Sequence, residues 1–138
     1  MNKGFTLVEI LVAVIILSLG ILAVSEMTVL GMRTTTVVDQ RMYARVAMAQ
    51  VYEDLFNLPA THGFLQDPEA GTVNDLADTA TPDFSQTLTD SVAQWSYDVR
   101  YNVADNVPET DLKTVRIHII WGLKNPKMIS TDLVRRMD

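Results

Sequence analysis

One acidic residue, Glu9, lies in an amino-terminal segment that is otherwise largely apolar from Phe5 to Val24. A carboxylate in hydrocarbon costs about 3 kcal/mol or more unless something pairs with it. Glu9 follows Phe5 by four residues, which is about one turn of a helix. The chemistry open to Glu9 is therefore pairing with a cation.

The segment allows three interpretations. It has about 20 residues, enough to cross a bilayer as a helix, and Lys3 on its amino side places the start of the chain in the cytoplasm. It could be a signal peptide removed after the small residues 23–25, or an anchor that is never processed. In the third interpretation, cleavage between Gly4 and Phe5 keeps the whole helix.

Glu9 favours the third interpretation, because neither of the others gives a buried carboxylate a role. Cleavage between Gly4 and Phe5 creates an α-amine at Phe5, and this cation can meet Glu9 of a neighbouring molecule in a shared apolar core. Breaking such a pair would cost about 3–5 kcal/mol, so the pair can set the register between subunits. Pairing within one chain is also possible.

Other catalytic or metal chemistry is not indicated. The two histidines, His62 and His118, have no metal-ligand partner at a useful spacing and no serine in a nucleophile motif, so we expect both at the surface. The acidic residues between 67 and 90 lack the ligand spacing of a calcium loop. Trp95 and Trp121 fall on apolar strand faces and are expected in the core. The sequence thus predicts no enzyme activity, no cofactor and no metal.

The composition excludes further classes. The net charge of −6 makes nucleic-acid binding improbable, because a run of phosphates could not be neutralised. The chain has no cysteine, which excludes disulfides, thiolate metal sites and cysteine nucleophiles.

The stretch Gly4-Phe5-Thr6-Leu7-Val8-Glu9, after a short basic leader and before an apolar run, resembles the class III signal of type IV pilins and pseudopilins. The resemblance implies that a prepilin peptidase cuts between Gly4 and Phe5 and methylates the Phe5 amine. It also implies that Glu9 acts in assembly with Phe5. Residues 10–13 and 16–22 are similar to minor pilins of the PilV kind, and the likeness continues loosely to about Leu55.

The resemblance also implies partners and a location. The partners would be other minor pilins, the major pilin, the prepilin peptidase and the inner-membrane assembly platform. The chain would cross the inner membrane once, with its amino terminus cytoplasmic and its carboxyl-terminal domain periplasmic. It would then enter a pilus fibre or tip at the cell surface, with the roles in adhesion and twitching motility that pili have.

Beyond the apolar segment, a helical pattern continues to Pro59. Residues at three- and four-residue steps form one face, and from Ala44 to Leu55 this face is apolar, so we expect it to pack on a sheet. Gly31 and the threonines 34–36 are weaker helix formers and indicate local softening. The predicted divisions are a leader (1–4), a membrane or fibre-core half of the helix (5–25) and a periplasmic half (26–58).

The rest of the chain predicts a loop region and a sheet. Residues 59–94 are polar, acidic and rich in proline and glycine, which indicates a long connection with room for one short helix or strand. The resemblance to pilins implies that this connection is a variable loop. Residues 95–138 alternate apolar and polar side chains between turns near 106–111 and 122–127, as in an antiparallel sheet. The predicted fold is α+β and type IV pilin-like, with one long amino-terminal helix packed on a small antiparallel sheet.

The sequence is compatible with three functions. The first is a structural minor pilin that helps to prime or cap pilus assembly. The second is a minor pseudopilin of a type II secretion system, which would share the leader, helix and fold. The third, a membrane-tethered periplasmic enzyme or ligand-binding domain, is disfavoured because it leaves Glu9 without a role.

Overall fold

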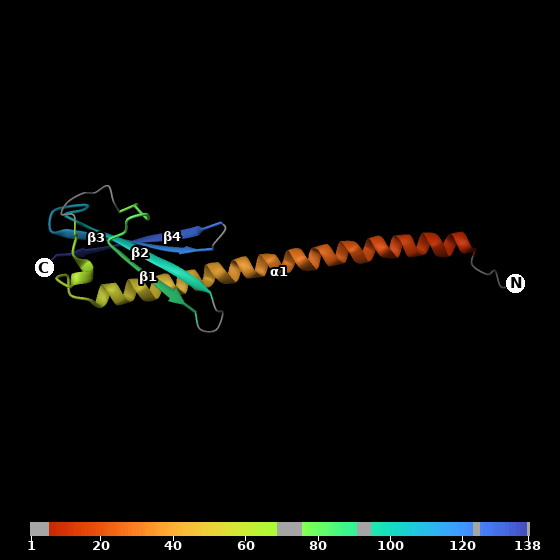
Figure 1. Cartoon of the computed structure of the whole chain (residues 1–138), viewed down its shortest axis with the longest axis horizontal. Coiled ribbons are helices and arrows are strands. Elements are labelled where there is room, and N and C mark those ends of the chain that lie inside the picture. Colours follow the sequence, from red (N-terminus) through yellow and green to blue (C-terminus); the bar gives the residue numbers. More distant parts are fainter. Residues whose placement is uncertain (1–5, 69–75, 91–94, 123–124, 138) are drawn as a thin grey trace. The chain divides into compact units, whose positions relative to one another are not determined.

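The computed structural model describes residues 6–68, 76–90, 95–122 and 125–137. Two compact units, 1–41 and 42–138, divide the chain. A single helix, α1 (Leu7–Asn57), begins in the first unit and ends in the second, and a four-stranded antiparallel sheet follows it (Figure 1). The predicted α+β, type IV pilin-like fold is confirmed.

Helix α1 has 51 residues and continues without a break through Gly31 and the threonines 34–36, where softening was expected. Each of these threonine hydroxyls donates a hydrogen bond to a backbone carbonyl four residues earlier, at 2.9–3.0 Å. Because the preceding turn satisfies these hydroxyls, the three threonines are accommodated in the interior of the helix. The helix ends at Asn57, two residues before Pro59.

The sheet is a simple meander of β1 (Phe84–Thr89), β2 (Ser96–Asp105), β3 (Leu112–Trp121) and β4 (Lys127–Arg136). Each strand pairs antiparallel with the next, in the order β1-β2-β3-β4. The turn between β2 and β3 contains two residues with positive φ, Asn106 and Asp111, residue types that tolerate this conformation. Three strands match the predicted positions, but the sheet begins earlier than residue 95, because the expected connection 59–94 supplies β1.

The core of the second unit lies between the sheet and the carboxyl-terminal part of α1. As predicted, the helix buries Ala44, Met48, Val51 and Leu55. The strands contribute the alternating side chains of one face, among them Val99, Ile117 and Leu133, each 0% exposed. The full set of buried residues in this cluster is Ala44, Met48, Val51, Leu55, Leu65, Tyr97, Val99, Tyr101, Val103, Val115, Ile117, Ile119, Trp121 and Leu133.

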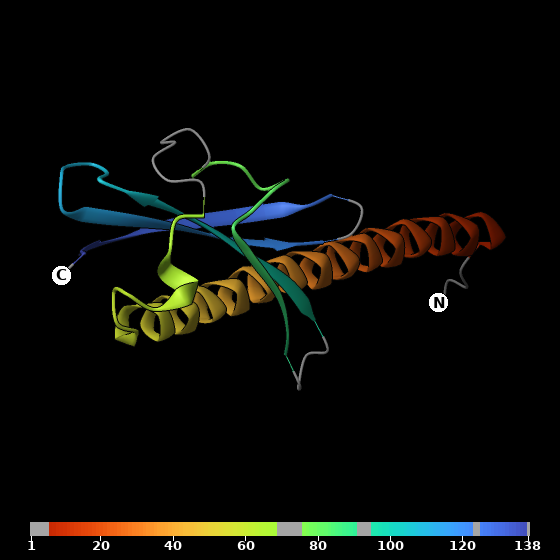
Figure 2. The same cartoon turned by 60° about the vertical axis from the view of Figure 1, so that its left-hand side comes forward.

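The opposite face of the sheet is partly covered by residues 76–83, so the sheet lies between this segment and the carboxyl-terminal part of α1 (Figure 2). Asn102 on β2 is fully buried and makes two contacts there: its side-chain nitrogen donates to the Asp78 carbonyl (2.6 Å), and its oxygen accepts from the Asp83 amide (3.0 Å). Arg100 also donates to the Thr79 carbonyl. Hydrogen bonds to backbone therefore fix part of the acidic connection on the sheet.

Arg135 on β4 satisfies the end of α1. Its guanidinium donates to the carbonyls of Leu55, Phe56 and Leu58, the last at 2.7 Å. The last carbonyls of a helix lack partners within the helix and carry partial negative charge, so a cation stabilises them. The last turn of α1 has no basic residue of its own, and a strand 77 residues later supplies one.

Candidate functional site

Of the predicted assembly residues Glu9 and Phe5, only Glu9 is described; Phe5 and the predicted processing residue Gly4 lie outside the described residues. Thr6 caps α1, which begins at Leu7, and Glu9 occupies the third position of the helix. Its Oε2 accepts from the Thr6 amide at 3.0 Å and from the Thr6 hydroxyl at 3.1 Å, and the Glu9 amide donates to that hydroxyl at 3.3 Å. This reciprocal arrangement is a capping box, which fixes the start of a helix.

The capping box gives Glu9 a second role that the sequence interpretation missed. The signal was present as Thr6-Leu7-Val8-Glu9, the S/T-x-x-E pattern of a helix start. Both described hydrogen bonds to the carboxylate reach Oε2, so Oε1 stays available to a cation near the start of the helix. The carboxylate also complements the positive end of the helix dipole.

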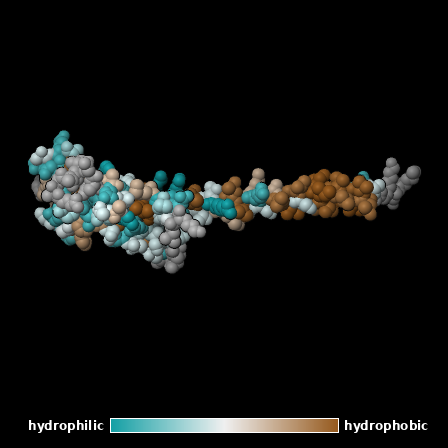
Figure 3. All heavy atoms as spheres, turned by 45° about the horizontal axis from the view of Figure 1, so that its top comes forward, coloured by the Kyte–Doolittle hydropathy of each residue, from teal (hydrophilic) through white to brown (hydrophobic). Residues whose placement is uncertain are grey.

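The helix around Glu9 has an unburied apolar surface. Its large side chains from Leu7 to Val24 are 47–79% exposed, and Figure 3 shows a predominantly hydrophobic surface there. The small polar residues are satisfied within the helix: Ser18 donates to the Val14 carbonyl at 2.7 Å and Ser25 to the Ile21 carbonyl at 2.9 Å. The helix is long and apolar enough to cross a membrane. Such a surface needs lipid or other apolar helices around it.

The comparison with protein families decides how this terminus is interpreted. Residues 1–25 match the family model described as the prokaryotic N-terminal methylation motif. The match covers the leader and the apolar segment that resemble a class III prepilin signal. No curated protein and no solved structure matches the chain.

The leader and the fold together support a type IV pilin-like or pseudopilin protein. A class III leader implies processing by a prepilin peptidase, and with the apolar helix it suggests membrane anchoring as in pilins. A structural role of this kind is generally not enzymatic.

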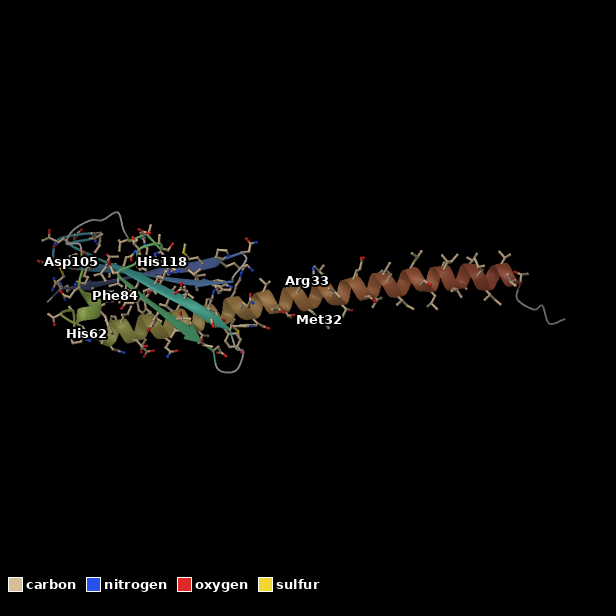
Figure 4. All side chains as sticks on the ribbon, viewed as in Figure 1. Met32, Arg33, His62, Phe84, Asp105 and His118 are labelled. Atoms are coloured by element: carbon tan, nitrogen blue, oxygen red, sulfur yellow. The ribbon has the colours of Figure 1, made fainter. Side chains whose placement is uncertain are left out.

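The two histidines lie in different settings (Figure 4). His62 is half-buried, and its Nδ1 accepts from the Phe64 amide at 3.2 Å, capping a short 3-10 helix, η1 (Gly63–Leu65). His118 on β3 is only 3% exposed, so the prediction that it lies at the surface is wrong. The outer face of the sheet is polar, as the alternation indicated, but residues 76–83 cover this part of it.

His118 links β3 to β4 and to the segment of residues 76–83 through hydrogen bonds of its ring. Its Nε2 lies 2.9 Å from the Leu76 carbonyl, which can only accept, so in the neutral ring this nitrogen carries the proton. The Nδ1 then accepts from the Ser130 hydroxyl on β4, at 2.8 Å. The sequence shows no motif that joins His118 to a serine, and it could not reveal this pair because the two residues meet across neighbouring strands. The pair ties β4 and residues 76–83 to β3.

Beside this pair, Arg116 on β3 donates to both carboxylate oxygens of Asp132 on β4, at 2.7 and 2.8 Å. These hydrogen bonds lower the pKa of Asp132 and raise that of Arg116. Both side chains are about one-third exposed or more, so the pair contributes little stability. A shallow pocket of about 430 Å³ includes these two residues, His118 and Ser130.

The described residues contain no group of three or more acidic, histidine or cysteine side chains placed to hold a metal ion. Trp121 is buried, as expected. Trp95 is partly buried and packs edge-on against Tyr43, with ring centroids 5.5 Å apart.

Proposed function

We propose that this chain is a structural minor pilin of the PilV kind, incorporated into a type IV pilus through α1 and helping to prime or cap assembly. The observation that carries the proposal is the methylation motif at residues 1–25 together with the exposed apolar half of α1. A prepilin peptidase cleaves between Gly4 and Phe5 and methylates the Phe5 amine. The helix then crosses the inner membrane with the second unit in the periplasm.

In this account Glu9 is the assembly carboxylate. Cleavage frees an amine at Phe5, next to the residue that caps α1 in this structure. In a fibre core that amine has no water to stabilise it, so it needs the Glu9 carboxylate of an adjacent subunit. Removing the carboxylate alone would leave a buried cation unpaired, at a cost of about 3–5 kcal/mol. The partners are therefore other minor pilins and the major pilin, which the assembly platform brings together.

The capping box allows the charge of Glu9 to be tested apart from its role in the helix. Glutamine also serves at this position of a capping box, so Glu9→Gln keeps the helix start and removes the charge. Thr6→Ala removes the capping hydroxyl and keeps the Glu9 charge. We expect Glu9→Gln to lower the amount of this subunit in sheared fibres about 100-fold or more, and Thr6→Ala to lower it little. Equal incorporation of Glu9→Gln and the unchanged chain would contradict the assembly role.

A minor pseudopilin of a type II secretion system remains the alternative, because the same leader, helix and fold support it. The two are separated by the assembly that the processed chain enters. Copurification with pilus fibres supports the pilin. Loss of protein secretion with normal pili on deletion supports the pseudopilin.

A further inference from the structure

The two edge strands of the sheet differ in the charge that they present to another chain. An edge strand exposes unpaired backbone groups, and proteins commonly blunt such edges with charged side chains. Strand β4 carries four charged residues: Lys127, Asp132, Arg135 and Arg136. Strand β1, with the sequence FSQTLT, carries no charge and no proline. A second β4 would meet like charges at the β4 edge, whereas the uncharged β1 edge raises no such barrier, so β1 can accept a charged strand.

An apolar groove lies beside β1. It has a volume of about 360 Å³ and lies between β1, η1 and the carboxyl-terminal part of α1. Phe84 of β1 lines it together with Phe64, which is 53% exposed, and the two rings are in edge contact with centroids 5.6 Å apart. Gln86, on the same side of β1, is exposed. The chain's own helix thus leaves the core side of β1 partly uncovered.

We propose that β1 pairs with β4 of a second copy of this chain, which extends the sheet from one subunit into the next. Because each strand is antiparallel to its neighbour, β4 runs antiparallel to β1. A second copy in the same orientation can therefore place its β4 against β1 as a regular antiparallel neighbour. A symmetric β1-to-β1 pair of antiparallel strands would instead reverse the strand direction of the second copy.

The side chains of the two edges select one register for this pairing. With Phe84, Gln86 and Leu88 on the core side of β1, and Ile129, Thr131 and Leu133 on the core side of β4, only registers that join these two sets continue both faces of the sheet. One such register places apolar side chains opposite apolar side chains and polar side chains opposite polar ones. It pairs Phe84 with Leu133, Gln86 with Thr131, Leu88 with Ile129 and Asp90 with Lys127.

Charge also fits this choice of partner. Two acidic residues lie beside the β1 edge: Asp90 follows the strand, and Asp54 lines the groove. Strand β4 has three basic residues, of which Arg135 caps α1 of its own chain and Lys127 and Arg136 remain. Arg116 pairs the one acidic residue of β4, Asp132. The β1 edge therefore attracts β4, whereas two β1 edges repel each other. The contact joins two different surfaces, so it can repeat from copy to copy.

Cysteine cross-linking in native membranes tests this contact, because the chain has no cysteine of its own. In the proposed register Thr89 faces Met128, and both are exposed. We expect co-expressed Thr89→Cys and Met128→Cys chains to form a disulfide-linked dimer on mild oxidation. Within one copy these positions are three strand spacings apart, about 14 Å, beyond the reach of a disulfide of about 7 Å.

The matched control replaces Met128→Cys by Val134→Cys, which is exposed on the same face of β4 but lies six residues, about 20 Å, further along. If Thr89→Cys formed a dimer equally with Met128→Cys and with Val134→Cys, the cross-link would reflect random collision and would overturn the proposed register. A dimer from Thr89→Cys alone would show symmetric β1 pairing, and a link to a different protein would show another occupant. Either result, or no dimer at all, would overturn the proposal.

A second pair, Thr87→Cys with Ser130→Cys, faces across the same register and repeats the test if the first pair disturbs folding. Charge reversal gives an independent readout. Asp90→Lys should lower the cross-linking yield about twofold to fivefold, and Lys127→Asp in the partner should restore it. The contact does not involve Gly4, Phe5 or Glu9, so its failure would leave the proposed function standing.

Discussion

The two compact units use apolar residues in opposite ways. In the second unit, 42–138, the strand residues Ile117, Ile119 and Leu133 are 0% exposed beneath α1. In the first unit, leucines and isoleucines of the same helix are more than half exposed. Burial of apolar area stabilises folded protein by about 25 cal/mol per Å². The second unit obtains this stabilisation within the chain, whereas the first can obtain it only from lipid or from other helices.

The same substitution in both units should therefore have opposite results. Leu133→Ala removes a fully buried side chain and should lower the free energy of unfolding by about 2–5 kcal/mol. Leu17→Ala, at a side chain that is 63% exposed, should change it by less than about 0.5 kcal/mol. Urea unfolding of the full chain in detergent, followed by the fluorescence of Trp95 and Trp121, measures both. A large effect of Leu17→Ala would mean that this side chain is buried within the folded chain.

Alkaline pH should destabilise only the second unit. Burial, with a smaller contribution from the Asp83 charge, raises the pKa of Tyr101 to about 12. Between pH 10 and 12 the unfolded chain loses this proton and the folded chain keeps it, so stability falls as pH rises, by about 2–3 kcal/mol. Tyr101→Phe should remove this part of the pH dependence. Parallel pH profiles for the two proteins would contradict the assignment.

The cap on α1 gives a smaller effect within the same unit. Arg135→Gln removes the cation from three helix carbonyls and should cost about 1–3 kcal/mol. The neighbouring Arg136 is exposed, so Arg136→Gln is a matched control that should change little. Denaturant unfolding of both variants measures the difference, and equal midpoints would show that the cap does not contribute.

The smallest effect should come from the exposed pair of Arg116 and Asp132. Hydrogen bonding to Arg116 lowers the pKa of Asp132, so its contribution is present above the unfolded value and is lost as pH falls through the lower folded value. We expect less than about 1 kcal/mol, because the pair is partly exposed. Asp132→Asn should flatten the acid limb of the stability profile only slightly. A change of several kcal/mol would mean that the pair is shielded.

The helix and the strands with a regular alternation of apolar and polar residues over a long segment were predictable from the sequence. The apolar face from Ala44 to Leu55 and the alternating strands of the second half both follow from repeats of 3.6 and 2 residues. The terminal motif was recognisable because leader, cleavage position and Glu9 are adjacent in sequence. The family match at residues 1–25 is consistent with that local signal.

What the sequence could not reveal depends on contacts between distant residues. His118 was expected at the surface, because nothing near it in sequence indicates that Leu76, 42 residues earlier, covers it. The Arg135 cap joins residues 77 or more positions apart. β1 was hidden in a polar connection because its side chains are mostly exposed and it gains order by pairing with β2. The capping box, by contrast, was readable and was missed because Glu9 already had an explanation.

The central claim, that this chain is processed and assembled as a pilin-like subunit, is tested most directly by mass spectrometry of its amino-terminal peptide from native membranes. The account predicts a peptide that starts at Phe5 and carries one added methyl group. A peptide that starts after residue 25, or an intact Met1 in cells with a working prepilin peptidase, would contradict it.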